Sequence, residues 1–376
     1  MKVEQAQWTP TQGWSGDLGP EGADLVLVFG AREPLEAGAV LEELAARQPG
    51  TPLVGCSTAG EILDVAVTDG TVIASAVRFE SSHVRTASAR IGEAPDAEAL
   101  GRRLATALPP EGIRSVMVLS EGISVNGSDL ARGLRAVLPP GTLVTGGLSG
   151  DAAYFQRTVV VDGTNARDGT VVVVGFYGDR LRVGHGCLSG WDPFGPERLV
   201  TRAEGNVLHE LDGRSALALY KKYLGEHARE LPSSALMFPL SIRTEGREGS
   251  LVRTILAVDE ERQTMTFAGD IPEGSWARLM KANFERLIDG AEGAARYAFD
   301  TLDGTPAELA ILISCVGRKL VLDQRIEEEV EVVRDVLGAR AALTGFYSYG
   351  EISPLLEPGG CELHNQTMTI TTFAEV

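Results

Sequence analysis

The chain has 376 residues, of which 52 are acidic and 34 basic, so its formal net charge is −18. Such a field repels a nucleic-acid backbone or an anionic membrane surface, and neither class of partner is expected. No run approaches the roughly 20 apolar residues of a membrane span, and the first residues lack the apolar core of a signal peptide. A cytoplasmic location is therefore expected.

The first unit in chain order is predicted to be a β-α-β unit. Asp24–Gly30 is a short apolar run of the kind found in strands buried on both faces. A helix is expected to begin at Pro34, and a second strand, Pro52–Cys56, follows it. Residues 1–22 are rich in glycine and proline, which predicts a loosely packed arm.

The same order of strand, helix and strand recurs twice. In the second unit Ser115–Ser120 predicts a strand, Ser128 the N-cap of a helix over Asp129–Leu138, and Leu143–Thr145 the next strand. The third unit consists of the strand Leu309–Cys315, the helix Asp323–Leu337 and the strand Ala341–Thr344. The units are followed by the predicted strands Thr71–Phe79, Thr158–Asp162 with Thr170–Tyr177, and Glu362–Phe373.

Each unit ends in a turn of small residues, and two of these turns are near twins. Val54–Ile62 reads VGCSTAGEI and Gly345–Ile352 reads GFYSYGEI, so both carry the frame G-x-x-x-x-G-E-I. Thr145–Asp151, TGGLSGD, is a looser copy in which Gly147, Gly150 and Asp151 take similar parts. An internal duplication explains this pattern, and the three turns are expected to wall one binding site.

A different region separates the second unit from the third. It contains a predicted helix ending at Leu224, a hairpin of Ser250–Val258 with Gln263–Ala268, and a long helix over Trp276–Phe299. The sequence thus predicts an α/β protein of two related halves, built from repeated β-α-β units with mixed sheets. The predicted divisions are an arm over 1–22 and domains over 23–215 and 216–376.

These motifs, with others in the same order, resemble the FIST proteins from about Asp24 to Phe373. The other motifs are DGRSALALYKKYLG (212–225), GDIPEG (269–274), ISCVGRK (313–319) and LHNQTMT (363–369). The resemblance implies an N-terminal and a C-terminal FIST domain in a bacterial intracellular sensor. It further implies an amino-acid-like ligand and a separate signalling partner, such as a histidine kinase, a cyclic-di-nucleotide enzyme or a chemotaxis component. A similar branch of the family includes haem-binding nitric oxide sensors.

The glutamates of the twin turns are the first candidates for ligand contact. Glu61 and Glu351 each follow a glycine at the carboxyl side of a strand, where α/β sheets usually bind ligands. Glycine lets backbone N–H groups approach a ligand carboxylate, and a glutamate beside them suits an amine. The alternative is that both glutamates cap helices or hold the two halves together. Tyr347 and Tyr349 either wall the pocket or belong to a domain seam.

The last two motifs supply further candidates. Cys315 and Arg318 lie together at the end of a predicted strand. They form an anion-binding corner, or Cys315 is a nucleophile with His364 as its base, or both residues are structural. His364 and Asn365 are polar residues entering a predicted strand, and His364 is the first candidate for a haem ligand. The expected ligand-binding residues are Cys56, Ser57, Thr58, Glu61, Ser149, Asp151, Cys315, Arg318, Tyr347, Tyr349, Glu351, His364 and Asn365.

The expected function is that of a sensor, not an enzyme, which binds a small ligand without a cofactor. The first alternative is a gas sensor that binds haem through His364. The second is a thiol-dependent hydrolase that uses Cys315, although no nucleophile, base and orienting acid form a recognisable motif. The cysteines include no CxxC pair and the histidines no HExxH pattern, so no metal site is expected apart from haem.

Overall fold

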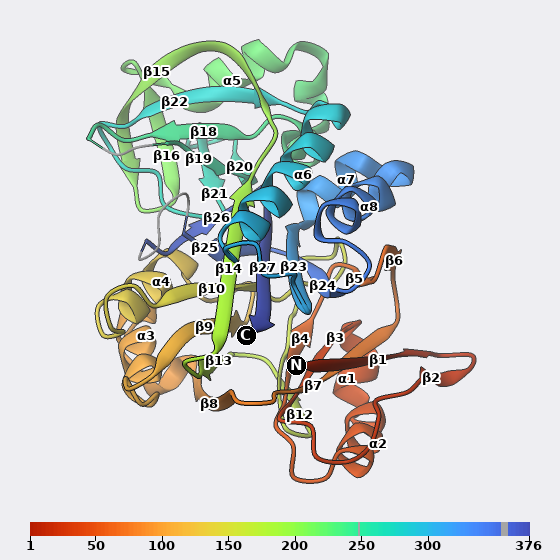
Figure 1. Ribbon diagram of the computed structural model, residues 1–376. Coiled ribbons are helices and arrows are strands. Elements are labelled where there is room, and N and C mark those ends of the chain that lie inside the picture. The colour runs from red at the N-terminus through yellow and green to blue at the C-terminus, as the bar shows by residue number, and fades with distance from the viewer. Residues whose placement is uncertain (247–248, 355–359) are drawn as a thin grey trace.

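Each predicted β-α-β unit forms a pair of parallel strands in the computed structural model, which describes residues 1–246, 249–354 and 360–376 (Figure 1). The pairs are β3 (Leu25–Gly30) with β4 (Leu53–Ser57), β9 (Ile113–Ser120) with β10 (Leu143–Leu148), and β23 (Leu309–Cys315) with β24 (Ala342–Ser348). These strands are almost wholly buried, which explains their nearly continuous apolar sequences.

A third strand lies antiparallel beside the first strand of each pair. These strands are β7 (Val72–Arg78), β13 (Thr170–Tyr177) and β27 (Met368–Glu375). Helices connect the strands of each pair: α1 (Arg32–Ala37) and α2 (Ala39–Arg47), α4 (Gly127–Arg135), and α7 (Val316–Leu322) with η4 (Asp323–Arg325) and α8 (Ile326–Leu337). Two more helices pack against these, α3 (Ala97–Thr106) on α4 and α6 (Phe284–Asp300) on α8.

The strand that comes after each signature turn joins the sheet of another unit. β5 (Glu61–Leu63) of the first unit pairs with β24, β25 (Gly350–Ser353) of the third with β10, and β11 (Val160–Asp162) of the second with β4. The three sheets consequently share one central strand order: β11-β4-β3-β7, β25-β10-β9-β13 and β5-β24-β23-β27. The exchange closes into a ring of three units. The predicted α/β class with mixed sheets is confirmed, and the repeated unit occurs three times.

Further strands complete the edges of the three sheets. On one side lie β12 (Asn165–Arg167), β26 (Glu362–His364) and β6 (Ala66–Thr68), and on the other β1 (Lys2–Thr9) with β2 (Gly13–Gly16), β8 (His83–Arg90) and β14 (Leu181–Leu188). The short 3-10 helix η1 (Ile91–Glu93) precedes α3.

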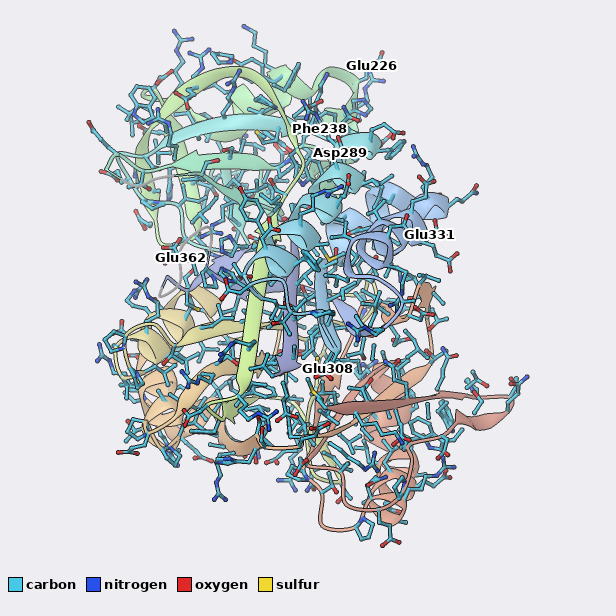
Figure 2. All side chains as sticks on the ribbon, in the orientation of Figure 1. Glu226, Phe238, Asp289, Glu308, Glu331 and Glu362 are labelled. Atoms are coloured by element: carbon cyan, nitrogen blue, oxygen red, sulfur yellow. The ribbon has the colours of Figure 1, made fainter. Side chains whose placement is uncertain are left out.

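Residues 1–22 are not the loosely packed arm that their composition predicted. β1 pairs with β7 from Lys2 to Trp8, and the Gln5 amide donates to the Leu343 carbonyl at 2.9 Å. Tertiary partners of this kind satisfy the polar side chains of the segment, which composition does not reveal. The Met1 amino group lies 3.3 Å from the carboxylate of Glu308, which Figure 2 labels near the meeting point of the two termini.

The third unit carries an insertion over residues 189–283, drawn at the top of Figure 1. Its strands form an eight-stranded antiparallel sheet around a core that includes Leu217, Tyr220 and Phe267. The strands are β15 (Asp192–Glu204), β16 (Val207–Leu211), β17 (Arg214–Ser215), β18 (Leu240–Arg243), β19 (Leu251–Arg253), β20 (Ile255–Asp259), β21 (Thr264–Phe267) and β22 (Trp276–Lys281). The insertion also holds α5 (Ala216–Leu224) and the 3-10 helices η2 (Gly225–Glu230) and η3 (Ser233–Met237).

Further predictions differ from the structure. The helix expected over Trp276–Phe299 begins only at Phe284, because Trp276–Lys281 forms the strand β22, which pairs with β15 and β18. The cap of α4 is Asn126, not Ser128, since the Asn126 side chain accepts from the backbone N–H of Ser128. Within the described ranges no helix has the length and apolar character needed to cross a membrane.

Candidate functional site

The three signature turns meet and hydrogen-bond to one another through their backbones. The amide of Gly150 donates to the Ser57 carbonyl at 2.8 Å, which joins the second turn to the first. The amide of Ala59 donates to the Tyr347 carbonyl at 2.8 Å, and the amide of Tyr349 to the Leu148 carbonyl at 3.2 Å. We call residues 57–60, 148–152 and 347–349 the turn ring. Its members pack on one another, and cavities lie beside them.

One position of the predicted alignment is wrong. In the strand register Gly146, not Gly147, is the equivalent of Gly55 and Gly345. Each of these three glycines stands opposite a residue of the parallel neighbouring strand. A Cβ at any of these three positions would lie within 1.7–1.9 Å of a carbonyl oxygen of the parallel neighbour, so only glycine fits. The corrected register gives the second turn Ala152 where the twin turns carry glutamate.

The two glutamates of the twin turns are buried and fully bonded. Glu351 accepts from the Ser348 hydroxyl at 2.6 Å, and from the hydroxyl and backbone amide of Thr367 at 2.8 and 3.1 Å. Glu61 accepts in the same pattern from Thr58 and from Thr71. Each carboxyl therefore ties the end of its turn to the residue just before the third strand of its own unit.

Burial shifts the pKa of both carboxyls in the same direction. Loss of water raises the pKa of Glu61 to about 7 and that of Glu351 to about 7, against the opposing effect of the hydroxyl and amide donors. A carboxyl whose pKa is higher in the folded state binds more protons when folded. Its contribution to stability is complete below about pH 4.5 and is lost as the pH rises through 7.

The variant Glu351→Gln is expected to flatten the pH dependence of stability between pH 5 and pH 7.5. Over this interval the native chain should lose on the order of 2 kcal/mol of unfolding free energy for each of its two buried carboxyls. The variant retains only Glu61, so its unfolding free energy should fall by the contribution of that one carboxyl. Urea unfolding at both pH values measures the slope. Glu226→Gln is the matched control, because Glu226 lies at the surface (Figure 2). Equal slopes in the native chain and Glu351→Gln would contradict the assignment.

Tyr349 links the third turn to the segment that follows the second. Its hydroxyl donates to the Asp151 carboxylate and accepts from the Phe155 amide at 3.0 Å. The Phe155 ring stacks on the Tyr349 ring with a centroid distance of 4.3 Å. The other Asp151 oxygen accepts from the amides of Gln156 and Arg157. The segment from Asp151 to Phe155 is therefore held in place by one side chain of another unit.

Two cavities adjoin at this segment, at the carboxyl ends of the strand pairs. The first, which we call the apolar cavity, has a volume of about 840 Å³ and includes Tyr349 and Phe155 in its wall. The second, the polar cavity, has a volume of about 620 Å³ and includes Thr58, Glu61 and Asp151. Ala153 and Leu320 line both. Each cavity is within the size range of small-molecule sites.

The other predicted site residues line neither cavity. Arg318 is fully buried, where it donates to the Glu329 carboxylate at 3.0 Å, to the Leu287 carbonyl at 2.7 Å and to the Ser189 carbonyl. It is a structural residue rather than an anion-binding corner. Tyr347 is also buried, with the Lys319 ammonium 5.7 Å from its ring centre. The remaining residues that lie in the interior are Cys56, Ser57, Ser149, Cys315, Glu351, His364 and Asn365.

The structure does not support a thiol and imidazole pair. Burial raises the pKa of the Cys315 thiol, which opposes formation of the nucleophilic thiolate. Burial also lowers the pKa of His364 to about 4, and its Nε2 lies 2.8 Å from the Ser353 carbonyl oxygen. Neither side chain lines the apolar or the polar cavity.

The residues present also do not fit a haem group bound through His364. Among the described residues that line the two cavities there is no His, Cys or Met. His364 is buried in β26, its Nε2 contacts the Ser353 carbonyl oxygen, and it lines neither cavity. In the same described part of the chain, no cluster of His, Cys, Asp and Glu has the geometry to hold a metal ion.

Sequence reasoning missed the charged residues of the polar cavity. Lys319 and Arg32 bring positive charge to it, and Glu33, Asp69 and Asp323 bring negative charge. One signal was available: Lys319 is one of only five lysines and stands next to Arg318 in the ISCVGRK motif. The others lie in loops and helix starts whose positions only the fold defines.

The fold and the site define a class: an α/β protein of three strand-exchanged units with ligand-sized cavities beside the ring of turns. Two family models match the chain, the FIST N domain over residues 24–214 and the FIST C domain over residues 216–354. The chain belongs to the FIST family, whose domains are sensor domains of signal transduction. The boundary between the two models falls inside the insertion, at Ser215, the last residue of β17.

Individual proteins match the chain at low sequence identity. An uncharacterized protein of Mycobacterium tuberculosis (strain H37Rv) is 25% identical over 252 residues, which are 63% of this chain and 62% of that protein. One of Methanocaldococcus jannaschii is 26% identical over 237 residues, 55% of this chain and 44% of that protein. The match thus spans less than two thirds of these relatives. A cyanuric acid hydrolase structure from A. caulinodans covers 78% of this chain and 99% of its own at 10% identity, with a TM-score of 0.19, which establishes no shared fold.

Proposed function

We propose that this protein is a sensor that binds an amino-acid-like ligand in the polar cavity and signals through a separate protein. It is proposed to act without a cofactor and without catalysing a reaction. The observation that supports this most directly is the presence of both charge signs in a cavity beside the turn ring. A zwitterion offers the complementary pair of charges.

The positive side of the cavity suits a ligand carboxylate. The Lys319 ammonium donates to the Ala59 carbonyl at 2.8 Å and pairs with Asp69. The Arg32 guanidinium pairs with Glu33 and Glu36, while its buried Nε atom has no protein partner. An ammonium group still has an N–H free for a carboxylate, and a guanidinium binds carboxylates strongly.

The negative side suits an amine. The side chains of Asp69 and Glu33 are each 67% exposed, so their carboxylates remain open to a ligand. With Glu61 left out because burial raises its pKa, four acidic side chains line the cavity against two basic ones. This surplus disfavours a ligand that carries only negative charge, such as a nucleotide, and favours one that carries an ammonium group.

Signalling is proposed to follow from differential binding. A ligand in the polar cavity contacts the turn ring and α7, and so favours whichever arrangement of these elements it binds better. The family suggests a histidine kinase, a cyclic-di-nucleotide enzyme or a chemotaxis component as the partner that reads this arrangement.

The variant Asp69→Asn is expected to weaken amino-acid binding at least about tenfold, because it removes a carboxylate that faces the ligand amine. Isothermal titration of the full chain with the twenty amino acids identifies the ligand and measures the change. Asp179→Asn is the matched control, since Asp179 is an exposed member of a surface ion pair with Arg114, away from the cavity. Absence of binding by any amino acid, or equal effects of the two variants, would refute the proposal.

A further inference from the structure

We propose that the apolar cavity is a second ligand site, which binds an uncharged small molecule with a flat aromatic or alicyclic body. The site is separate from the polar cavity and lies between the three-unit ring and the inserted sheet. The composition of its walls, the bonding of its polar side chains and its position between two parts of the fold support this assignment.

The walls gather apolar side chains that are otherwise unexplained on the surface. Ile123, Phe155, Leu256 and Leu320 are each 40–45% exposed and all line this cavity. They are four of the ten large apolar side chains exposed in the described part of the chain. Such clustering marks a binding site rather than ordinary surface variation. The stacked rings of Phe155 and Tyr349, inclined by 15°, add a flat surface.

Three of the polar side chains that line the cavity are bonded within the protein. The Tyr349 hydroxyl is held by Asp151, and the Asn206 amide donates to the Phe267 carbonyl at 2.7 Å. The Asn126 carbonyl oxygen caps α4, and its amide nitrogen lies 3.4 Å from the Asp270 carboxylate. No Lys or Arg is among the described residues that line this cavity. An anionic ligand would find no positive side chain among these lining residues, and a cationic ligand would find only Asp270. An uncharged ligand therefore fits best.

The two faces of the cavity come from different parts of the fold. Residues 122–126 and Leu148 belong to the second unit, whereas Leu236, Ile255 and residues 267–270 belong to the insertion. A ligand here contacts both, and so stabilises the insertion against the ring. This separates the site from the polar cavity, which no described residue of the insertion lines.

The segment from Asp151 to Phe155 connects the two cavities. Asp151 and Tyr154 line the polar cavity, Phe155 lines the apolar cavity, and Ala153 lines both. Ala152 and Phe155 have φ of 56° and 53°, a left-handed conformation that costs energy outside glycine. Displacement of this strained segment by one ligand changes the shape of the other site. This consequence, unlike the second site itself, rests on the proposed function.

The test uses two fluorescent probes that share one ring system. N-phenyl-1-naphthylamine is uncharged, and 8-anilino-1-naphthalenesulfonate adds a sulfonate to the same rings. The full chain is expected to bind the uncharged probe saturably, with one site, and the sulfonate at least about tenfold more weakly. Leu256→Glu and Ile123→Glu each place a carboxylate in the cavity. Each is expected to lower the affinity for the uncharged probe at least about tenfold. Both side chains are exposed, so folding is expected to survive; circular dichroism checks it.

Two controls define the result. Val137→Glu changes an exposed apolar residue of the second unit that does not line the cavity, and should leave probe affinity unchanged. Asp69→Asn should also leave it unchanged, which distinguishes this site from the proposed amino-acid site. Absence of saturable binding, preference for the sulfonate, or equal losses in Leu256→Glu and Val137→Glu would overturn the second site. Probe binding without any amino-acid binding would refute only the proposed function.

Discussion

Replacement of Gly55 or Gly345 by alanine is expected to lower the free energy of unfolding by about 3 kcal/mol or more. A Cβ at Gly55 would lie 1.7 Å from the Val28 carbonyl oxygen, and one at Gly345 would lie 1.8 Å from that of Leu312. Both obstacles are backbone atoms in a buried parallel strand pair, so a side-chain rotation cannot relieve the contact. The strands would have to separate and lose ladder hydrogen bonds.

Chemical denaturation followed by circular dichroism measures this loss. Gly92→Ala is the matched control, because a Cβ at Gly92 meets no atom within 4 Å and its backbone is not in the left-handed region. The control should change stability by less than about 0.5 kcal/mol, as surface substitutions usually do. If Gly55→Ala proved as mild as Gly92→Ala, the strand register assigned to the turns would be wrong.

The variant Arg318→Met is expected to lower the free energy of unfolding by about 3–5 kcal/mol, because it leaves Glu329 buried without its charged partner. The same guanidinium bonds to the Ser189 carbonyl, where the insertion begins, and to the Leu287 carbonyl in α6, just after it ends. Its removal should therefore loosen both ends of the insertion. Hydrogen exchange is expected to accelerate around Ser189 and in the first turns of α6.

Two further variants separate the causes. Arg114→Met removes an arginine from the exposed pair with Asp179 and should cost less than about 1 kcal/mol. The double variant Arg318→Met with Glu329→Leu leaves no unpaired charge, and should recover part of the stability while exchange at Ser189 stays fast. Unchanged exchange at both ends of the insertion in Arg318→Met would show that Arg318 does not hold it.

The local elements were largely predictable because each depends on residues close together in the chain. The strand Leu309–Cys315 was predicted with the observed bounds, since a run of seven apolar and small residues suits a strand buried on both faces. The prediction failed over Trp276–Lys281, where alanine, leucine and methionine favour a helix but pairing with β15 and β18 imposes a strand. Propensity is weaker than the hydrogen bonds and burial that a neighbouring strand provides.

The candidate site was predictable in part. The turns were found because duplication preserved the glycine positions, and the structure brings all three together. The roles of their side chains were not visible, since the partners of Glu351 and Glu61 include Thr367 and Thr71, outside the turns themselves. The lining of the polar cavity comes from positions as distant as Arg32 and Lys319, which no local pattern connects.

By itself, the sequence determined the repeated strand, helix and strand order, the glycine-bearing turns and the family to which they belong. Only the tertiary structure decided that the strand after each turn crosses to another unit, because strand pairing depends on edges that become available only after the sheets assemble. The same exchange buries most of the predicted site residues, so the cavities are lined mainly by other residues near them. A short motif records which backbone conformations are possible, whereas the partners of its side chains depend on residues brought near by the whole fold.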